Sequence, residues 1–121
     1  MKVTEIAFTG YSVTNIKRAR QFYEEVLGLT ATMVFGDEKA SWIEYDIGPS
    51  TLAITNFAPD WKPSPSGGSA ALEVDDFEAA TKQLKASGAA FRVEPIETPV
   101  CRMAVISDPD GNSITIHRRK A

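Results

Sequence analysis

The chain repeats one pattern twice, and this repeat constrains the fold more than any other feature of the sequence. An apolar strand leads into a short amphipathic helix that ends at a glycine, first over residues 13–28 and again over residues 74–88. The two copies are offset by about 61 residues, with a drift of one. Self-similarity at a fixed spacing indicates that each copy forms the same supersecondary unit. We therefore expect two structurally similar halves.

Each copy predicts one helix that lies on a sheet. Over residues 16–27 the apolar side chains recur at helical spacing, and the charged side chains occupy the other face. Thr14-Asn15 offers an N-cap, and Gly28 fits the left-handed position just past the helix end. In the second copy we expect a helix over residues 77–87, capped by one of the two aspartates that precede it.

Strands fill the rest of both halves. Alternating apolar residues bounded by turn residues predict strands at residues 3–13, 30–35, 40–45 and 51–55, and at residues 70–74, 91–93, 102–106 and 113–117. The run 108–112 is a turn that joins the last two strands as a hairpin. Each half is then βαβββ. The predicted fold class is α+β, with tandem βαβββ modules whose curved mixed sheets form a cleft and are each backed by a helix.

A linker separates the two modules. Residues 58–68 contain three prolines and two glycines, a composition typical of connecting segments. We assign residues 1–57 to the first module and residues 69–121 to the second. A length of 121 residues suits one compact domain made of both.

Composition and charge exclude several classes of partner. The net charge of -3 gives no electrostatic footprint for nucleic acid. No stretch approaches the roughly 18 apolar residues that span a bilayer, and the N-terminal residues lack the apolar core of a signal peptide. The single cysteine, Cys101, is compatible with a reducing compartment. We expect a cytoplasmic protein with neither a nucleic acid nor a membrane partner.

Three ordered segments resemble the vicinal oxygen chelate superfamily, which includes glyoxalase I, extradiol dioxygenases, fosfomycin resistance enzymes and bleomycin resistance proteins. Residues 13–28 are similar to its strand-to-helix signature, with Phe22-Tyr23 and Leu27-Gly28 as landmarks. Residues 72–76 and 108–112 resemble its two later landmarks. The resemblance extends over nearly the whole chain. It implies the paired βαβββ fold and a homodimer.

The metal-dependent members of this family hold a divalent ion with His and Glu side chains, and the ion acts as a Lewis acid. The resemblance places the ligand positions of that site at Phe8, Ala53, Ser69 and Thr115. None of these side chains is an imidazole, a carboxylate or a thiolate, the groups that bind such ions. We therefore expect a metal-free cleft with no cofactor, and glyoxalase-type activity is disfavoured.

The leading hypothesis is binding of a small organic molecule in that cleft. Phe8 would stack on the molecule, Ser69 and Thr115 would hydrogen-bond to it, and Ala53 would leave room for it. No catalytic residue is assigned.

Larger side chains could also line the cleft, although such residues more often belong to a core. They are Trp42, Tyr45 and Met103, which we rank below the strand positions named for the ligand. His117 has the same strand parity as Thr115 and could face the cleft as well. The candidate ligand-binding residues are Phe8, Ser12, Trp42, Ala53, Ser69, Met103, Thr115 and His117.

Two alternatives remain open. The chain could be a superfamily enzyme, a lyase, isomerase or dioxygenase, with metal-free acid/base chemistry at His117 or Glu44. A relocated divalent metal at His117, helped by Glu44, Glu73 or Cys101, would also serve such an enzyme. The chain could instead lack a ligand, with its small residues serving close packing and its surface serving assembly.

Trp61 in the linker is either a lid over a ligand or a plug that fixes the linker, and the plug is favoured.

Overall fold

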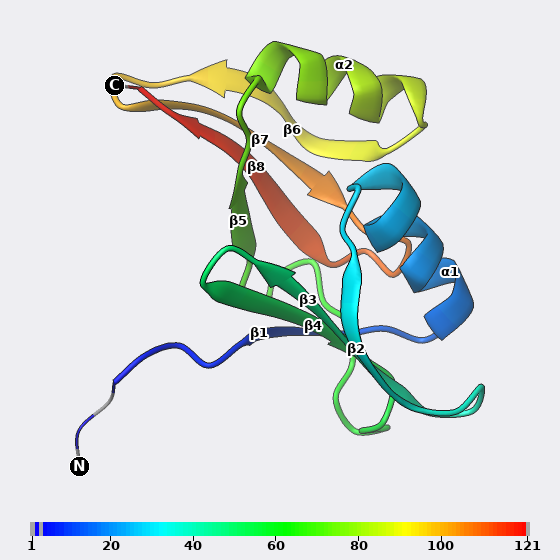
Figure 1. Ribbon diagram of the computed structural model, residues 1–121. Coiled ribbons are helices and arrows are strands. Elements are labelled where there is room, and N and C mark those ends of the chain that lie inside the picture. The colour runs from blue at the N-terminus through cyan, green and yellow to red at the C-terminus, as the bar shows by residue number, and fades with distance from the viewer. Residues whose placement is uncertain (1, 3, 121) are drawn as a thin grey trace. The chain divides into compact units, whose positions relative to one another are not determined.

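The computed structural model describes residues 2 and 4–120 and divides into two compact units, residues 1–63 and 64–121. The division falls inside the Pro- and Gly-rich segment 58–68. Each unit contains one four-stranded mixed sheet and its own helical segment (Figure 1). The predicted α+β fold class, with two βαβββ modules, is confirmed.

The first unit forms a sheet of order β1-β4-β3-β2, in which β1 is parallel to β4 and the other pairs are antiparallel. Its elements are β1 (Thr9–Ser12), α1 (Ile16–Arg20), η1 (Gln21–Val26), β2 (Ala31–Gly36), β3 (Ser41–Ile47) and β4 (Ser50–Thr55). Asn15 is the N-cap of α1, because its side chain accepts a hydrogen bond from the Arg18 N–H. Gly28 has φ of 74°, as its predicted place past the helix end requires.

The second half of the first helix is wound as a π-helix, η1. The Leu27 N–H donates to the Phe22 carbonyl oxygen at 3.0 Å, five residues back instead of four. Sequence periodicity predicted one continuous α-helix here, and the wider turn is a correction. Two adjacent residues of this segment, Phe22 and Tyr23, both face the core. Single π turns inside helices occur often near functional sites.

Aromatic stacking forms the core of the first unit. The rings of Tyr23 and Tyr45 are stacked at 6.0 Å and 16°, and both residues have no exposed surface. Ile43 and Ile54, which are register partners, are also fully buried. The helical segment therefore covers the face of the sheet that these side chains share.

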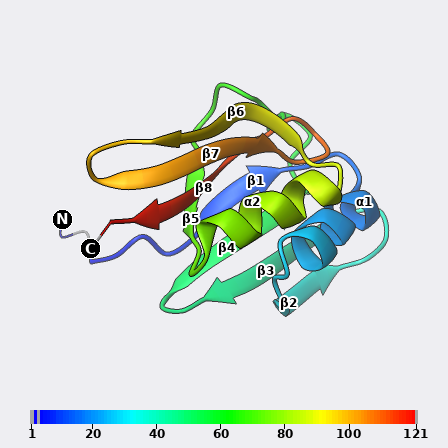
Figure 2. The same cartoon turned by 90° about the horizontal axis from the view of Figure 1, so that it is seen from above.

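The second unit has the equivalent order β5-β8-β7-β6, with β5 parallel to β8. Its elements are β5 (Ala70–Glu73), α2 (Phe77–Ala86), β6 (Ala90–Glu97), β7 (Cys101–Ser107) and β8 (Ser113–Arg119). Asp76 caps α2, since its carboxylate accepts from the Ala79 N–H at 3.0 Å. Figure 2 shows β6, β7 and β8 running side by side, with α2 on one face of the sheet.

Two predicted strands differ from the structure by more than two residues at one end. The strand expected at residues 3–13 is only β1, and residue 3 lies outside the described residues. Residues 4–6 extend beyond the start of β4 at Ser50, so they have no partner in the described sheet. The strand expected at residues 91–93 extends over β6 and includes Pro95. Pro95 lies at a register irregularity of this edge strand, between Val93 and Ile96, where a missing N–H is tolerated.

None of the helices in residues 2 and 4–120 is long and apolar enough to span a membrane.

Candidate functional site

The helix-free face of the first sheet contains most of the predicted site residues of the first unit. Because Tyr45 and Ile43 point to the helix, the alternate residues of β3, Trp42 and Glu44, point to the other side. Trp42 pairs with Thr55 of β4, which pairs with Ser12 of β1. Glu44 likewise pairs with Ala53, which pairs with Gly10. This face consists of Gly10, Ser12, Trp42, Glu44, Thr51, Ala53 and Thr55.

Three aromatic side chains gather on this face, and we call Phe8, Trp42 and Trp61 the aromatic cluster. The rings of Phe8 and Trp42 meet edge to face at 5.1 Å and 89°. Trp61 lies over Gly10, since a Cβ atom at that glycine would be 3.0 Å from Cη2 of the indole. Phe8 is 46% exposed and Trp61 is 41% exposed. The cluster thus presents aromatic surface to an incoming molecule.

Hydrogen bonds fix the polar groups around the cluster. The Trp42 Nε1–H donates to a carboxylate oxygen of Glu44 at 2.8 Å, which holds the indole ring in place. The Ser12 hydroxyl donates to the carbonyl oxygen of Trp61 and ties the linker to β1. The backbone of Trp61 therefore attaches the linker to the first unit, and the choice between a plug and a lid stays a prediction.

The predicted residues of the first unit differ in accessibility. Phe8 precedes β1 and is open, whereas Ala53 has no exposed surface and Ser12 is buried with its hydroxyl engaged. One expectation is wrong: Tyr45 faces the helix and cannot line the same side as Trp42. Strand alternation accounts for this, since the two residues have opposite parity on β3.

The helix-free face of the second sheet is polar. Ile114 and Ile116 are buried under α2, so Thr115 and His117 point to the other side, as does Met103, the register partner of His117. The Ser69 hydroxyl donates to the carbonyl oxygen of residue 113 at 3.0 Å and lies 3.5 Å from the Thr115 hydroxyl. Thr115 and His117, which were expected to share a strand face, thus lie on the same side of the sheet, and the Ser69 hydroxyl lies beside Thr115.

A carboxylate–imidazole pair lies at the end of this polar face. Glu73 Oε1 is 2.6 Å from His117 Nδ1, and Oε2 accepts from the Arg119 backbone N–H at 2.8 Å. The Arg119 N–H and then the His117 hydrogen bond lower the pKa of Glu73 below its ordinary value. Glu73 is one of the three residues considered as helpers of His117, and the parallel pairing of β5 with β8 places it beside the imidazole. Glu44, another of the three, accepts a hydrogen bond from Trp42 instead.

No metal centre is evident in the part of the chain that the structure describes. Among residues 2 and 4–120, no group of three or more His, Cys, Asp or Glu side chains is arranged to hold an ion. Cys101 is a buried free thiol whose Sγ lies 3.2 Å from the Thr98 hydroxyl. The expectation of a metal-free site with no cofactor stays a prediction.

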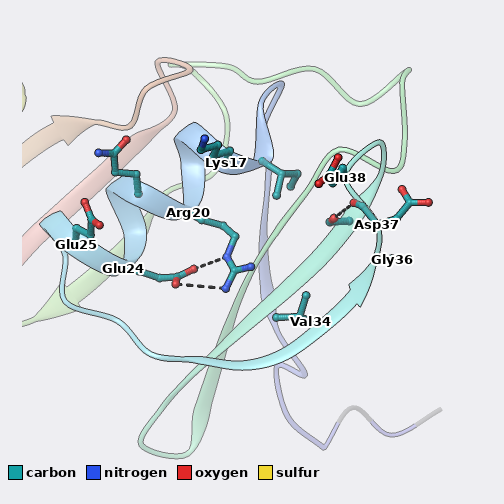
Figure 3. Close-up of a pocket in the computed structure, with 11 residues that line it drawn as sticks. Lys17, Arg20, Glu24, Glu25, Val34, Gly36, Asp37 and Glu38 are labelled. Carbon is teal, nitrogen blue, oxygen red and sulfur yellow. Dashed lines mark hydrogen bonds and ion pairs between the residues drawn. The ribbon is translucent and has the colours of Figure 1, made fainter.

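A separate groove of about 930 Å³ opens on the other side of the first sheet, between α1–η1 and the end of the β2–β3 hairpin. Figure 3 shows Arg20 and Glu24 on the helical wall, with Val34 and Asp37 on the hairpin. We call this the helix–hairpin groove. It is lined by Ile16, Lys17, Arg20, Gln21, Glu24, Glu25, Val34, Gly36, Asp37, Glu38 and Ser41. No pattern in the sequence indicates this groove.

An ion pair anchors the helical wall of the groove. Arg20 Nε donates to Glu24 Oε2 at 2.7 Å, and the Tyr45 hydroxyl donates to the same oxygen at 2.9 Å. Partial burial opposes ionisation of Glu24, but the hydrogen bonds from Arg20 and Tyr45 outweigh it and lower the pKa of this carboxyl. Burial, followed by the Glu24 hydrogen bond, raises the pKa of Tyr45. Glu24 is therefore charged and already paired.

Comparisons with known proteins agree with this architecture. The family model described as Glyoxalase/Bleomycin resistance protein/Dioxygenase superfamily matches residues 5–116. The crystal structure of TnmS3, an antibiotic binding protein from Streptomyces sp. CB03234, is 25% identical, with a TM-score of 0.82 over 99% of both chains. No curated protein matches the chain significantly.

Two further crystal structures show the same fold. A glyoxalase/bleomycin resistance protein from Streptomyces sp. CB03234 is 27% identical, with a TM-score of 0.76 over 93% of this chain and 98% of that chain. A superfamily member from Sphaerobacter thermophilus is 23% identical, with a TM-score of 0.75 over 96% and 98% of the two chains. Because the family model spans nearly the whole chain, this protein belongs to the glyoxalase/bleomycin resistance protein/dioxygenase superfamily.

Proposed function

We propose that this protein binds a small organic molecule with aromatic rings, without a metal ion, and that the molecule packs on the aromatic cluster. One observation supports this most directly: the exposed Phe8 ring meets the Trp42 ring edge to face at 5.1 Å, beside Trp61. Aromatic rings gain about 0.5–1.5 kcal/mol from such arrangements beyond simple burial. A planar aromatic ligand would extend the cluster by one more ring.

The four inherited ligand positions support the metal-free part of the proposal. They are occupied by Phe8, Ala53, Ser69 and Thr115, which lack the donors that divalent ions of this family need. The similarity to TnmS3, described as an antibiotic binding protein, supports binding in place of turnover.

Both tryptophans of the chain belong to the aromatic cluster, so intrinsic fluorescence reports on it directly. The test titrates 2-naphthamide and its saturated counterpart, decahydro-2-naphthamide, which have the same amide but differ in planarity and π surface. Saturable quenching by the aromatic compound alone supports the proposal. Phe8→Ala should weaken binding by about tenfold, the loss of roughly one ring contact.

The matched control is Phe91→Ala, which removes an aromatic ring in the second unit that lies under Lys85. This variant should bind 2-naphthamide as the wild type does. Equal binding of the aromatic and saturated amides would contradict the proposal, and so would an equal loss in both variants.

A second candidate function is acid/base catalysis at His117, as a lyase or isomerase. Glu73 contacts Nδ1 of the imidazole at 2.6 Å and orients the ring, which leaves Nε2 for proton transfer. The test measures exchange of C–H protons of hydroxyacetone and pyruvate in heavy water by NMR. Exchange that His117→Gln abolishes would favour the enzyme, and equal exchange in both proteins would exclude this role.

Assembly and location belong to the same proposal. The family resemblance supports a homodimer, which light scattering coupled to size-exclusion chromatography would test. The unpaired Cys101 thiol supports a reducing location in the cytoplasm. Fractionation of cells that express the tagged chain would test that location.

A further inference from the structure

The outer edge of β2 has neither the proline nor the charged side chains that protect many strand edges, although its pairing with β3 is irregular between Ala31 and Met33. Within the described residues, β2 pairs only with β3 and ends the sheet. In an antiparallel pair, alternate residues turn their N–H and C=O groups away from the partner strand. Such groups offer a template for another strand unless a proline, a charged side chain or a covering element blocks them.

A comparison with β6, the corresponding edge of the second sheet, makes this absence clear. The β6 sequence contains Pro95 together with Arg92 and Glu94, all of which oppose pairing with another strand. The β2 sequence, Ala-Thr-Met-Val-Phe-Gly, contains neither proline nor a charged residue. Its Val34 and Phe35 side chains are 54% and 64% exposed.

The helix–hairpin groove lies beside this edge. Val34 of β2 and Ile16 of α1 provide apolar surface in it, and Figure 3 shows Val34 directed into the hollow. A volume of about 930 Å³ exceeds what one side chain fills, so the groove can hold a short stretch of chain. A strand edge beside a helix-walled groove is a common site for an added peptide strand.

The charges of the groove select the kind of peptide. Arg20 and Glu24 neutralise one another. The side-chain carboxylates of Glu25 and Glu38 have no hydrogen bond or ion pair with any other described residue. The ionisable side chains that line the groove are the cations Lys17 and Arg20 and the anions Glu24, Glu25, Asp37 and Glu38. The surplus is therefore negative, and it favours a basic partner.

We propose that the groove and the free edge of β2 bind an extended basic segment of another polypeptide as an added strand. Backbone hydrogen bonds to β2 give the segment its register, one small apolar side chain contacts Val34, and flanking Lys or Arg side chains meet Glu25 and Glu38. A second copy of this chain fits less well. Its β2 contains no basic residue, and it would bring its own Asp37 and Glu38 toward the same charges. This interaction is additional to the proposed binding of an aromatic molecule.

The test uses two fluorescein-labelled peptides, acetyl-Lys-Val-Lys-Val-Lys-amide and the same sequence with Glu in place of Lys. Fluorescence anisotropy should show that the wild type binds the basic peptide at least about tenfold more tightly than the acidic one. Amide NMR signals of residues 31–36 should shift on binding. Glu25→Lys with Glu38→Lys should lose this preference.

The matched control is Glu5→Lys with Asp75→Lys, which changes the net charge equally at exposed positions outside the groove. This variant should keep the preference for the basic peptide. An equal loss in the control would show general charge attraction only, and unchanged β2 signals would place the peptide elsewhere. Shifts of β2 signals with protein concentration alone would assign the edge to a second copy. Each of these results would overturn the proposal.

Discussion

The two units share one topology but stabilise it with different chemistry. In the first unit, stacked tyrosines fill the helix side of the sheet and the aromatic cluster lies on the other side. In the second unit, aliphatic residues such as Ile114 and Ile116 fill the helix side, and hydroxyl and ionic groups occupy the other. The duplicated fold therefore fixes where side chains point but leaves their chemistry free to diverge.

Trp42→Ala should cause the largest effect, because it removes the ring on which Phe8 packs and the donor that Glu44 accepts. We expect a loss of about 2 kcal/mol in the free energy of unfolding, less than for a fully buried tryptophan. Binding of 2-naphthamide should be lost as well. Urea denaturation followed by circular dichroism measures the first, and Trp61 fluorescence measures the second.

The corresponding change on the second sheet is Met103→Ala, which removes a half-buried side chain next to His117. We expect it to leave the binding of 2-naphthamide unchanged. If both variants lose binding equally, the division between an aromatic and a polar face is wrong.

Tyr45→Phe tests how the first helix is attached to its sheet. The change removes the hydroxyl that donates to Glu24 at 2.9 Å but keeps the ring stacked on Tyr23. Loss of a hydrogen bond to a charged group should lower the free energy of unfolding by about 1.5 kcal/mol. In the second unit, Arg102 lies over the Phe77 ring at 5.0 Å, and Arg102→Met should cost less, because this contact is half-exposed.

Denaturation of both variants by urea gives these two values. A larger loss for Arg102→Met than for Tyr45→Phe would contradict the expectation that the Tyr45–Glu24 hydrogen bond contributes more to stability than the half-exposed Arg102–Phe77 contact. Because the pKa of Glu24 is lowered in the folded protein, the contribution of its ionised form is present above the ordinary carboxyl pKa and disappears as the pH falls.

Gly10→Ala probes a position where the repeat itself has diverged. The equivalent residue of the second copy, about 61 residues later, is Ala71. A Cβ atom at Gly10 would approach Cη2 of Trp61 to 3.0 Å, so the indole has to move. We expect a loss of about 1 kcal/mol and a shift of the tryptophan emission maximum.

The reciprocal change, Ala71→Gly, adds no atom and lies in the second unit, whereas both tryptophans belong to the first, so it should leave the emission spectrum unchanged. Differential scanning calorimetry and emission spectra of both variants measure these effects. An unchanged spectrum in Gly10→Ala would show that Trp61 does not depend on this contact.

Much of the fold could be predicted from the sequence, because its signals are local. Asn15, Gly28 and Asp76 mark helix ends through their own hydrogen bonds or φ angles, which the structure confirms. The π turn in η1 could not be predicted, since it depends on packing Phe22 and Tyr23 together against the sheet. Sheet pairing likewise decides where β1 begins, and residues 4–6 have no partner in the described sheet despite their alternation.

The candidate site was predictable to the extent that strand parity determines which residues share a face. Parity alone places Phe8 with Ser12 on one strand, and Thr115 with His117 on another. It could not show that Trp61 from the linker covers a glycine of β1, or which carboxylate contacts His117. Both are contacts between residues far apart in the sequence, and their distances depend on the completed sheet.

Glu73→Gln should have the smallest effect, and it sharpens the comparison at the polar face. The carboxylate accepts from the Arg119 N–H and contacts His117, and both interactions lower its pKa in the folded state. A lowered pKa means that the unfolded chain binds a proton more readily, so this stabilisation exists above the ordinary carboxyl pKa and is lost as the pH falls through the folded value. The wild type should therefore exceed Glu73→Gln in melting temperature near neutral pH, and the difference should shrink in acid.

Glu5→Gln, which removes an exposed carboxylate in the first unit, should show no such convergence in the same thermal scans. If the Glu73→Gln difference stayed constant at every pH, the Glu73–His117 pair would contribute through shape and not through charge, and the polar face would then resemble the aromatic one in the way it stabilises the fold.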